Sequence, residues 1–250
     1  MARCTEPLDF VWSNRGVIMN NMMMALMASK PGIMSVPWDF LFWADKVPGN
    51  NGDHITVWEE LIGGYDAPSA TATDAVLTKN ISAINGHSAI AFDGTQAYRN
   101  ASLAMGQPRT WVIVFSVENL GRDHYIMDGL DGTDRNNIAW RNTNPDAMRL
   151  TSDGANAIGY NKDLASGFIM ITGVFNGSNS KLYENGVLKV TGNAGTHSIA
   201  GITIGSSFNL NASVSLIGNV ALCGGFNNEP AGSELDRMQQ IVLNYYKIAA

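Results

Sequence analysis

The sequence predicts an all-β fold, a sandwich of two antiparallel sheets closed by one short C-terminal helix. Strand-like runs separated by short turns fill residues 168–223 almost completely. Asn185-Gly186 joins two of these runs, and Asn-Gly is a strong hairpin signal because both central residues of a type I′ turn need positive φ. Apolar side chains at helical spacing then follow Ser233, a plausible helix N-cap: Leu235, Met238, Val242 and Tyr245.

The individual strands can be placed from runs of β-branched, aromatic and alternating residues. In the C-terminal part they are expected at 168–175, 181–184, 187–190, 202–205 and 216–223. Residues 116–167 hold the longest predicted loops, with short strands at 137–141, 148–151 and 157–160. The last two are expected to pair across the turn Ser152-Asp153-Gly154.

Five short motifs follow one another in an order typical of a known family. They are a first strand at 41–45, a segment at 57–61 similar to "W-x-D-x-S-G" but without its Asp and Ser, an "N-G-x-P-A-V-x-F-D-G"-like segment at 84–94, a central strand at 111–115 and an "L-Y-x-N-G" hairpin at 182–188. On these residues the chain resembles the concanavalin-A-like or laminin-G-like jelly rolls of phage structural proteins and bacterial surface proteins. The resemblance covers roughly residues 39–247 and implies a jelly-roll domain at 38–250, preceded by a Met-rich arm at 1–37.

Composition narrows the function classes. The chain has 250 residues, which suits one large β-domain. Only 15% of them are charged, and the net charge is −6 with scattered basic residues, so a nucleic-acid partner, which needs a basic face, is not expected. No apolar run approaches the length of a membrane span. Cys4 and Cys223 match no metal-ligand spacing and are either two thiols or a disulfide between the arm and the last strand.

The arm is the strongest candidate for docking to a partner. Seven of its residues are methionines, and thioether side chains pack adaptably on irregular surfaces. A basic start and a good cleavage site of a signal peptide are lacking. The alternative is a helix that covers the domain's own sheet. The docking side chains would be Met19, Met22, Met23, Met24, Leu26 and Met27.

Two ligand sites are expected in the middle of the chain. A sugar needs an aromatic platform beside amide and carboxylate groups, which predicts a glycan site from Trp140, Asn142, Asn144, Asp146 and Tyr160. The alternative is that Trp140 belongs to the core. A calcium ion would take oxygen ligands from Asp128, Asp131 and Asp134, unless these Asp-Gly pairs are ordinary turns. No other cofactor is expected.

Catalysis is not expected. A retaining glycosidase needs two carboxyl groups about 5 Å apart, commonly supplied in this fold by a Glu-x-Asp-x-Glu strand that is missing here. Glu59 and Glu60 are adjacent, so on a strand they would face opposite sides.

These observations together favour a non-enzymatic virion structural protein, a phage capsid decoration or fibre component that displays a lectin-like jelly roll on the virion surface. Its arm would anchor it to the major capsid protein or another virion protein, it would form a homo-oligomer, and host surface polysaccharide is the expected glycan. The alternative is a secreted or cell-surface carbohydrate-binding module, located outside the cell, and a glucanase is the least favoured class.

Overall fold

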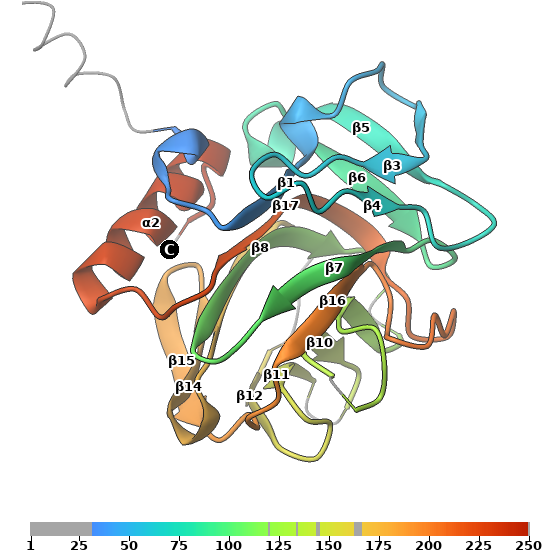
Figure 1. The fold of residues 1–250 in the computed structure, drawn as a ribbon. Coiled ribbons are helices and arrows are strands. Elements are labelled where there is room, and N and C mark those ends of the chain that lie inside the picture. The colour runs from blue at the N-terminus through green and yellow to red at the C-terminus, as the bar shows by residue number, and fades with distance from the viewer. Residues whose placement is uncertain (1–31, 120, 134, 144–145, 163–166, 250) are drawn as a thin grey trace, which may run out of the picture.

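The computed structural model describes residues 32–119, 121–133, 135–143, 146–162 and 167–249 (Figure 1). Within these residues the chain forms two large antiparallel sheets of nine and six strands, a two-stranded sheet and one α-helix near the C-terminus. The predicted all-β sandwich with a C-terminal helix is confirmed.

In the nine-stranded sheet, eight strands lie side by side along one path, and the ninth strand, β1, lies off this path and pairs with β17. Its order along that path is β15 (Val187–Gly192), β14 (Ser180–Glu184), β13 (Ile169–Phe175), β8 (Arg109–Val117), β17 (Ile217–Phe226), β6 (His87–Asp93), β5 (Ala75–Ile81) and β2 (His54–Ile55), while β1 spans Phe40–Trp43.

The six-stranded sheet faces it. Its order is β12 (Ala157–Asn161), β11 (Ala147–Thr151), β10 (Asn137–Arg141), β9 (His124–Asp128), β16 (Ile199–Ile204) and β7 (Tyr98–Met105). A small ribbon pairs β3 (Val57–Trp58) with β4 (Ala67–Pro68). The helical segments are η1 (Ile33–Ser35), η2 (Ala44–Lys46), η3 (Ser82–Ile84), η4 (Gly177–Asn179) and α2 (Gly232–Tyr246).

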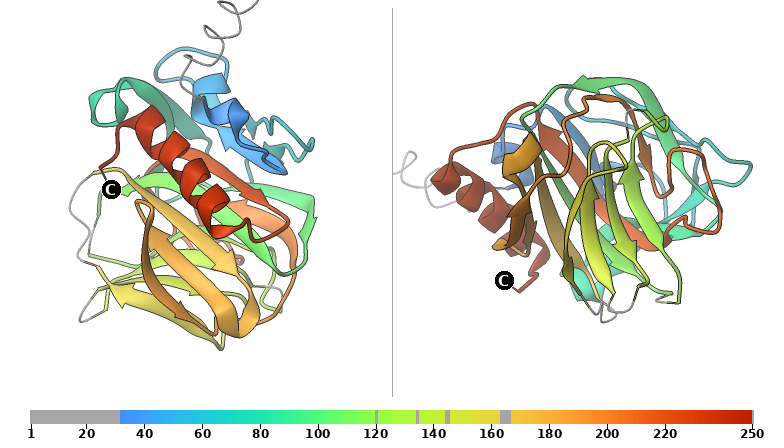
Figure 2. Two further views of the ribbon diagram at one scale, coloured as in Figure 1. Left: turned by 90° about the vertical axis from the view of Figure 1, so that its left-hand side faces the viewer. Right: turned by 90° about the horizontal axis from the view of Figure 1, so that it is seen from below.

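The nine-stranded sheet is buried on both faces. Along β8, Trp111, Ile113 and Phe115 belong to the core between the two sheets. The alternate residues Val112 and Val114 belong to a second core under α2, because successive side chains of a strand point to opposite faces. Burial on both sides explains why this strand reads as a continuous apolar run. Figure 2 shows α2 on one side of the nine-stranded sheet and the six-stranded sheet on the other.

The predicted hairpin is present. Asn185 and Gly186 have φ values of 48° and 81°, as a type I′ turn requires, and β14 pairs with β15 across them. The predicted strands at 137–141, 148–151 and 157–160 are confirmed as β10, β11 and β12, with β11 and β12 paired in register. Strand β9 was not predicted, because His124 and Asp128 at its ends looked like loop residues.

Helix α2 is confirmed, but it begins differently from the prediction. Its N-cap is Ala231, and no side chain caps it. Met238 and Val242 lie in the second core and Leu235 is buried, whereas Tyr245 is partly buried. None of the described helices is long and apolar enough to cross a membrane.

Part of the segment that the prediction assigned to the arm is packed in the core of the domain. Ile33 and Val36 are buried at 1% and 3% exposure in the second core. Trp38 stacks on Phe226, with ring centroids 5.0 Å apart, and its indole N–H donates to the Ile33 carbonyl at 3.0 Å. The segment from Ile33 onward therefore belongs to the folded domain, not to an arm ending at residue 37.

The docking prediction for the arm stays a prediction. Its side chains lie outside the described residues: Met19, Met22, Met23, Met24, Leu26 and Met27. Cys4 lies outside them too, whereas Cys223 is fully buried on β17, where burial raises the pKa of its thiol.

Candidate functional site

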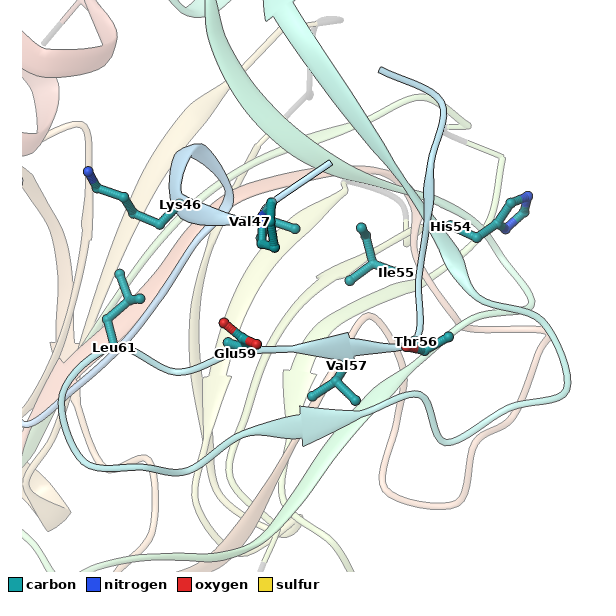
Figure 3. Close-up of a pocket in the computed structure, with 9 residues that line it drawn as sticks. Lys46, Val47, His54, Ile55, Thr56, Val57, Glu59 and Leu61 are labelled. Carbon is teal, nitrogen blue, oxygen red and sulfur yellow. The ribbon is translucent and has the colours of Figure 1, made fainter. Parts of the chain in front are cut away.

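Two regions of the described surface contain well-formed hollows. One hollow of about 340 Å³ lies beside η2, β2 and β3 (Figure 3). It is lined by Lys46, Val47, Pro48, His54, Ile55, Thr56, Val57, Glu59 and Leu61. Lys46 and His54 lie at opposite ends of the view in Figure 3, and both are exposed, as is Glu59. Exposed charges of this kind are solvated and do not by themselves indicate a ligand.

The other region is a row of three adjoining hollows on the outer face of the six-stranded sheet, of about 330, 90 and 150 Å³. The first two share Arg149 and Ala157, and the last two share Tyr125, Arg135 and Arg141. We call this row the sheet-face hollow.

The pairing of the strands places the charged groups of the sheet-face hollow. Ala139 of β10 lies opposite both Tyr125 of β9 and Arg149 of β11, and Arg149 lies opposite Gly159 of β12. These four residues form one row across the sheet, with small side chains beside the arginine. A β-carbon at Gly159 would lie only 3.0 Å from Cγ of Arg149, so glycine there leaves room for the arginine stem.

Two of the three arginines are held by partners. The Arg135 guanidinium pairs with Asp128 at 3.1 Å and lies between the rings of Tyr125 and Phe208, at 5.2 and 4.8 Å from their centroids. Arg141 pairs with Asp123 at 2.8 Å and donates a hydrogen bond of 3.0 Å to the Tyr125 hydroxyl. Their positive charges are therefore balanced within the protein.

The third arginine differs. Arg149 is partly buried, and its side chain makes no hydrogen bond, ion pair or ring contact with any residue that the structure describes. Its neighbours in the first hollow are Ala147, Ala157, Ile158, Gly159, Tyr160 and Asn161. A partly buried arginine in a concave surface, with no side-chain partner among the described residues, leaves its N–H donors free for water or for an anionic group.

The predicted glycan platform is wrong for Trp140. This side chain is fully buried in the core between the sheets, where its ring stacks on His124 at 5.6 Å and its N–H donates to the Lys162 carbonyl at 3.3 Å. Burial also lowers the pKa of His124. No sugar can stack on a tryptophan with no exposed surface.

The other predicted glycan residues are dispersed. Tyr160 lines the first hollow, and its hydroxyl donates to the Glu184 carboxylate. Asn142 is exposed, and its backbone N–H donates to Asp123 at 2.8 Å. Asp146 is partly buried, and its backbone carbonyl accepts a hydrogen bond from the Lys162 N–H at 2.9 Å. Asn144 lies outside the described residues.

Of the three predicted calcium ligands, the structure describes Asp128 and Asp131. The carboxylate of Asp128 is fully buried and accepts hydrogen bonds from Arg135 and from the Phe208 backbone. Burial raises the pKa of Asp128, against the effect of Arg135. Asp131 is exposed and accepts the Thr133 N–H at 2.8 Å as an ordinary turn does, and Asp134 lies outside the described residues. Among the residues described, no group of three or more His, Cys, Asp or Glu side chains could hold a metal ion.

The contacts of Glu60 stabilise the fold of a loop. It is buried, and its carboxylate accepts hydrogen bonds from four backbone N–H groups, those of Leu41, Ile62, Gly63 and Tyr65. This carboxylate fixes the loop that links β3 to β4 against β1.

Sequence reasoning missed the three arginines of the sheet-face hollow, although it identified the strands that carry Arg141 and Arg149. One signal was available: in β10, β11 and β12 large apolar residues alternate with small or cationic ones, and Arg141 and Arg149 both occupy the second set. The pairing register that brings them together could not be read from the sequence.

A scan of family models finds no match to the chain, and neither does a search of curated proteins. Solved structures share its fold. It is similar to Trypanosoma rangeli sialidase in complex with 2,3-difluorosialic acid, with 16% identity, a TM-score of 0.53, and coverage of 82% of this chain and 33% of the sialidase. It is similar to a GH54 α-L-arabinofuranosidase at 12% identity and a TM-score of 0.58, covering 77% of this chain and 51% of that one.

A third similar structure is of botulinum neurotoxin type C, whose cell entry depends upon interaction with two ganglioside molecules. Its identity is 14% and its TM-score 0.54, with 76% of this chain and 51% of the toxin chain covered. The chain thus spans about a third of the length of the sialidase and about half that of the other two. At these identities the likeness shows the fold alone, a lectin-like β-sandwich consistent with the concanavalin-A-like resemblance.

Proposed function

We propose that the protein is a non-enzymatic carbohydrate-binding β-sandwich and that its glycan lies in the sheet-face hollow. The observation that carries the proposal is Arg149, a partly buried arginine without a side-chain partner among the described residues, at the centre of a concave face. The similar structures support the carbohydrate-binding part of this proposal, because they are named as a sialidase, an arabinofuranosidase and a toxin that interacts with gangliosides.

The chemistry of the hollow favours binding over hydrolysis. Asp123 is the one acidic side chain among the described residues that line it, and this carboxylate is paired with Arg141. Hydrolysis of a glycosidic bond by the usual route needs a second carboxyl group across the bond. The described lining therefore supports a lectin-like role.

The proposed setting is the surface of a virion, where the domain would be displayed as a capsid decoration or fibre component. The low charged fraction of 15% and the apolar, Met-rich stretch at 17–28 support docking to a protein shell. A secreted or cell-surface module would share the glycan site and differ in location. Mass spectrometry of particles purified on a density gradient separates these settings, since only a virion component keeps a constant ratio to the capsid protein.

The proposed glycan site can be tested with a variant whose larger side chain occupies the sheet-face hollow. Ala157 is exposed and lines two parts of the sheet-face hollow, so Ala157→Trp places an indole there at little cost to the core. Val57→Trp is the matched control, because Val57 is 41% exposed and lines the hollow of Figure 3. On a glycan array we expect the intact protein and Val57→Trp to bind the same glycans, and Ala157→Trp to lose at least about tenfold in affinity. Silence of the intact protein on the array, or loss with Val57→Trp alone, would contradict the site.

A further inference from the structure

We infer that the sheet-face hollow recognises an acidic sugar, and that Arg149 binds its carboxylate through two parallel hydrogen bonds. This inference rests on the proposed function and adds the chemical class of the ligand. It follows from the charges of the hollow, the shape of a guanidinium and the residues beside it.

The first step is the charge that remains for a ligand. Arg135 and Arg141 are paired with Asp128 and Asp123, at 3.1 and 2.8 Å. Arg149 has no acidic partner among the described residues. The described lining of the hollow thus offers one unbalanced positive charge, which matches a ligand with one negative charge per sugar unit bound.

The second step is the geometry of recognition. A guanidinium presents its N–H groups as a planar fork, which matches the two oxygens of a carboxylate. Arg149 lies in a row between Ala139 and Gly159, and neither neighbour has a side chain long enough to compete for its donors. A sugar ring lying over these small residues would bring its carboxylate to the fork.

The third step is the remaining surface. Ala157 and Asn161 are exposed beside Arg149 and line the same hollow. The Asn161 amide can donate to and accept from hydroxyl groups, whereas the ring of Tyr160 packs on the core between the sheets and offers the sugar no platform. The hollow of about 330 Å³ is large enough for one or two sugar rings.

The experiment compares an oligogalacturonate with its methyl ester, which replaces each negative charge by a small neutral methyl ester group. Calorimetric titration of the intact protein is expected to show binding of the acid and a loss of at least about tenfold for the ester. Sialylated and sulfated oligosaccharides form two further arms. Binding of a sialylated glycan keeps the inference and changes only the source of the carboxylate, whereas binding of sulfated or neutral glycans alone overturns it.

Two variants assign the effect to Arg149. Arg149→Gln removes the charge and is expected to lower affinity for the acid by between roughly tenfold and a hundredfold, with little effect on the ester. Ala157→Glu places a carboxylate diagonal to Arg149 on the same face, because Ala157 lies opposite Thr151. The new carboxylate should pair with the guanidinium and block the acid, while Ala157→Gln should not.

Unchanged affinity in Arg149→Gln, or equal effects of Ala157→Glu and Ala157→Gln, would overturn the inference. Thermal melts of all variants exclude unfolding as the cause. A failure of the proposed function has a different signature, since no glycan of any charge would then bind the intact protein.

Discussion

Glu184 joins the two sheets at their edges through a carboxylate that is mostly buried. Its oxygens accept hydrogen bonds from Lys162, at 2.7 Å, and from the Tyr160 hydroxyl. Burial raises the pKa of Glu184, but the two hydrogen bonds outweigh it, so the pKa lies below its ordinary value of 4.5. The same carboxylate and burial raise the pKa of Tyr160.

This pKa gives a pH dependence of defined sign. A carboxyl group whose pKa is lower in the folded state stabilises the fold above about pH 4.5, and the contribution disappears as the pH falls through the folded-state pKa. We therefore expect Glu184→Gln to lower the free energy of unfolding at pH 7 by roughly 1–3 kcal/mol and by progressively less below pH 4.5. Urea unfolding of both proteins from pH 7 to pH 3 measures this difference, and a difference independent of pH would contradict the assignment.

Strand alternation explains which site residues could be predicted. Trp140 and Arg141 are neighbours on β10, but Trp140 points into the core and Arg141 lines the outer hollow. The sequence indicated the correct strand, and a tryptophan is a reasonable sugar platform. The face of that strand was wrong, because with period two a shift of one residue exchanges the inner and outer sets.

The pairing state of the arginines could not be predicted at all. Asp128 is near Arg135, and Asp123 is near Arg141, only because β9 lies beside β10 in the sheet. Arg149 is left without a described partner by the same arrangement. Composition and spacing carry no information about such contacts.

At the scale of secondary-structure elements, α2 is fixed to the nine-stranded sheet by polar contacts as well as by its apolar face. Asp45 accepts hydrogen bonds from the Tyr245 hydroxyl, at 2.8 Å, and from the Ser88 backbone, at 2.7 Å. The ring of His87 stacks on Tyr245, with centroids 3.9 Å apart, and its Nδ1 lies 2.7 Å from Asp45. These contacts join the C-terminal end of α2 to η2 and β6.

Truncation tests whether η1 is where the domain begins. We expect the chain without residues 1–31 to fold with the stability of the full chain, because every core residue in the described part of the chain lies at Ile33 or beyond. Removing residues 1–36 also removes the buried Ile33 and Val36, at an expected cost of about 3–6 kcal/mol. Urea unfolding of the two truncated chains measures the difference. Equal stability of the two, or unfolding of the shorter truncation, would contradict this boundary.

Whether a segment forms a strand, a turn or a helix was easier to predict than which other segments it packs against. The hairpin at Asn185-Gly186 and the helix at 232–246 depend on local turn chemistry and apolar spacing, and both are present. The burial of η1 depends on contacts with α2 at the other end of the chain. Residues 33–37 were therefore assigned to the arm, although their side chains complete the second core.

At the scale of the whole molecule, layering determines where a ligand can bind. The nine-stranded sheet has one face on the six-stranded sheet and the other on α2 and η1, as the two core clusters show. Figure 2 shows the same order of layers. The outer face of the six-stranded sheet carries the row of hollows instead, so the fold presents Arg149 on the side opposite α2.

This layering also explains why the fold class was predictable while the site was not. An alternating apolar run indicates a strand that is buried on one face, and a continuous apolar run indicates one that is buried on both. The five family-like motifs indicated the order of the strands along the chain. The outer face of the six-stranded sheet is not constrained by core packing, so its residues leave a weaker pattern in the sequence.

A crystal structure of the protein with bound oligogalacturonate tests the central claim most directly. We predict electron density for the sugar over β10–β12, with both carboxylate oxygens of one unit within about 3 Å of the Arg149 guanidinium. Density for the sugar in the hollow beside β2 and β3, or a sugar on the sheet face whose carboxylate points away from Arg149, would contradict the account.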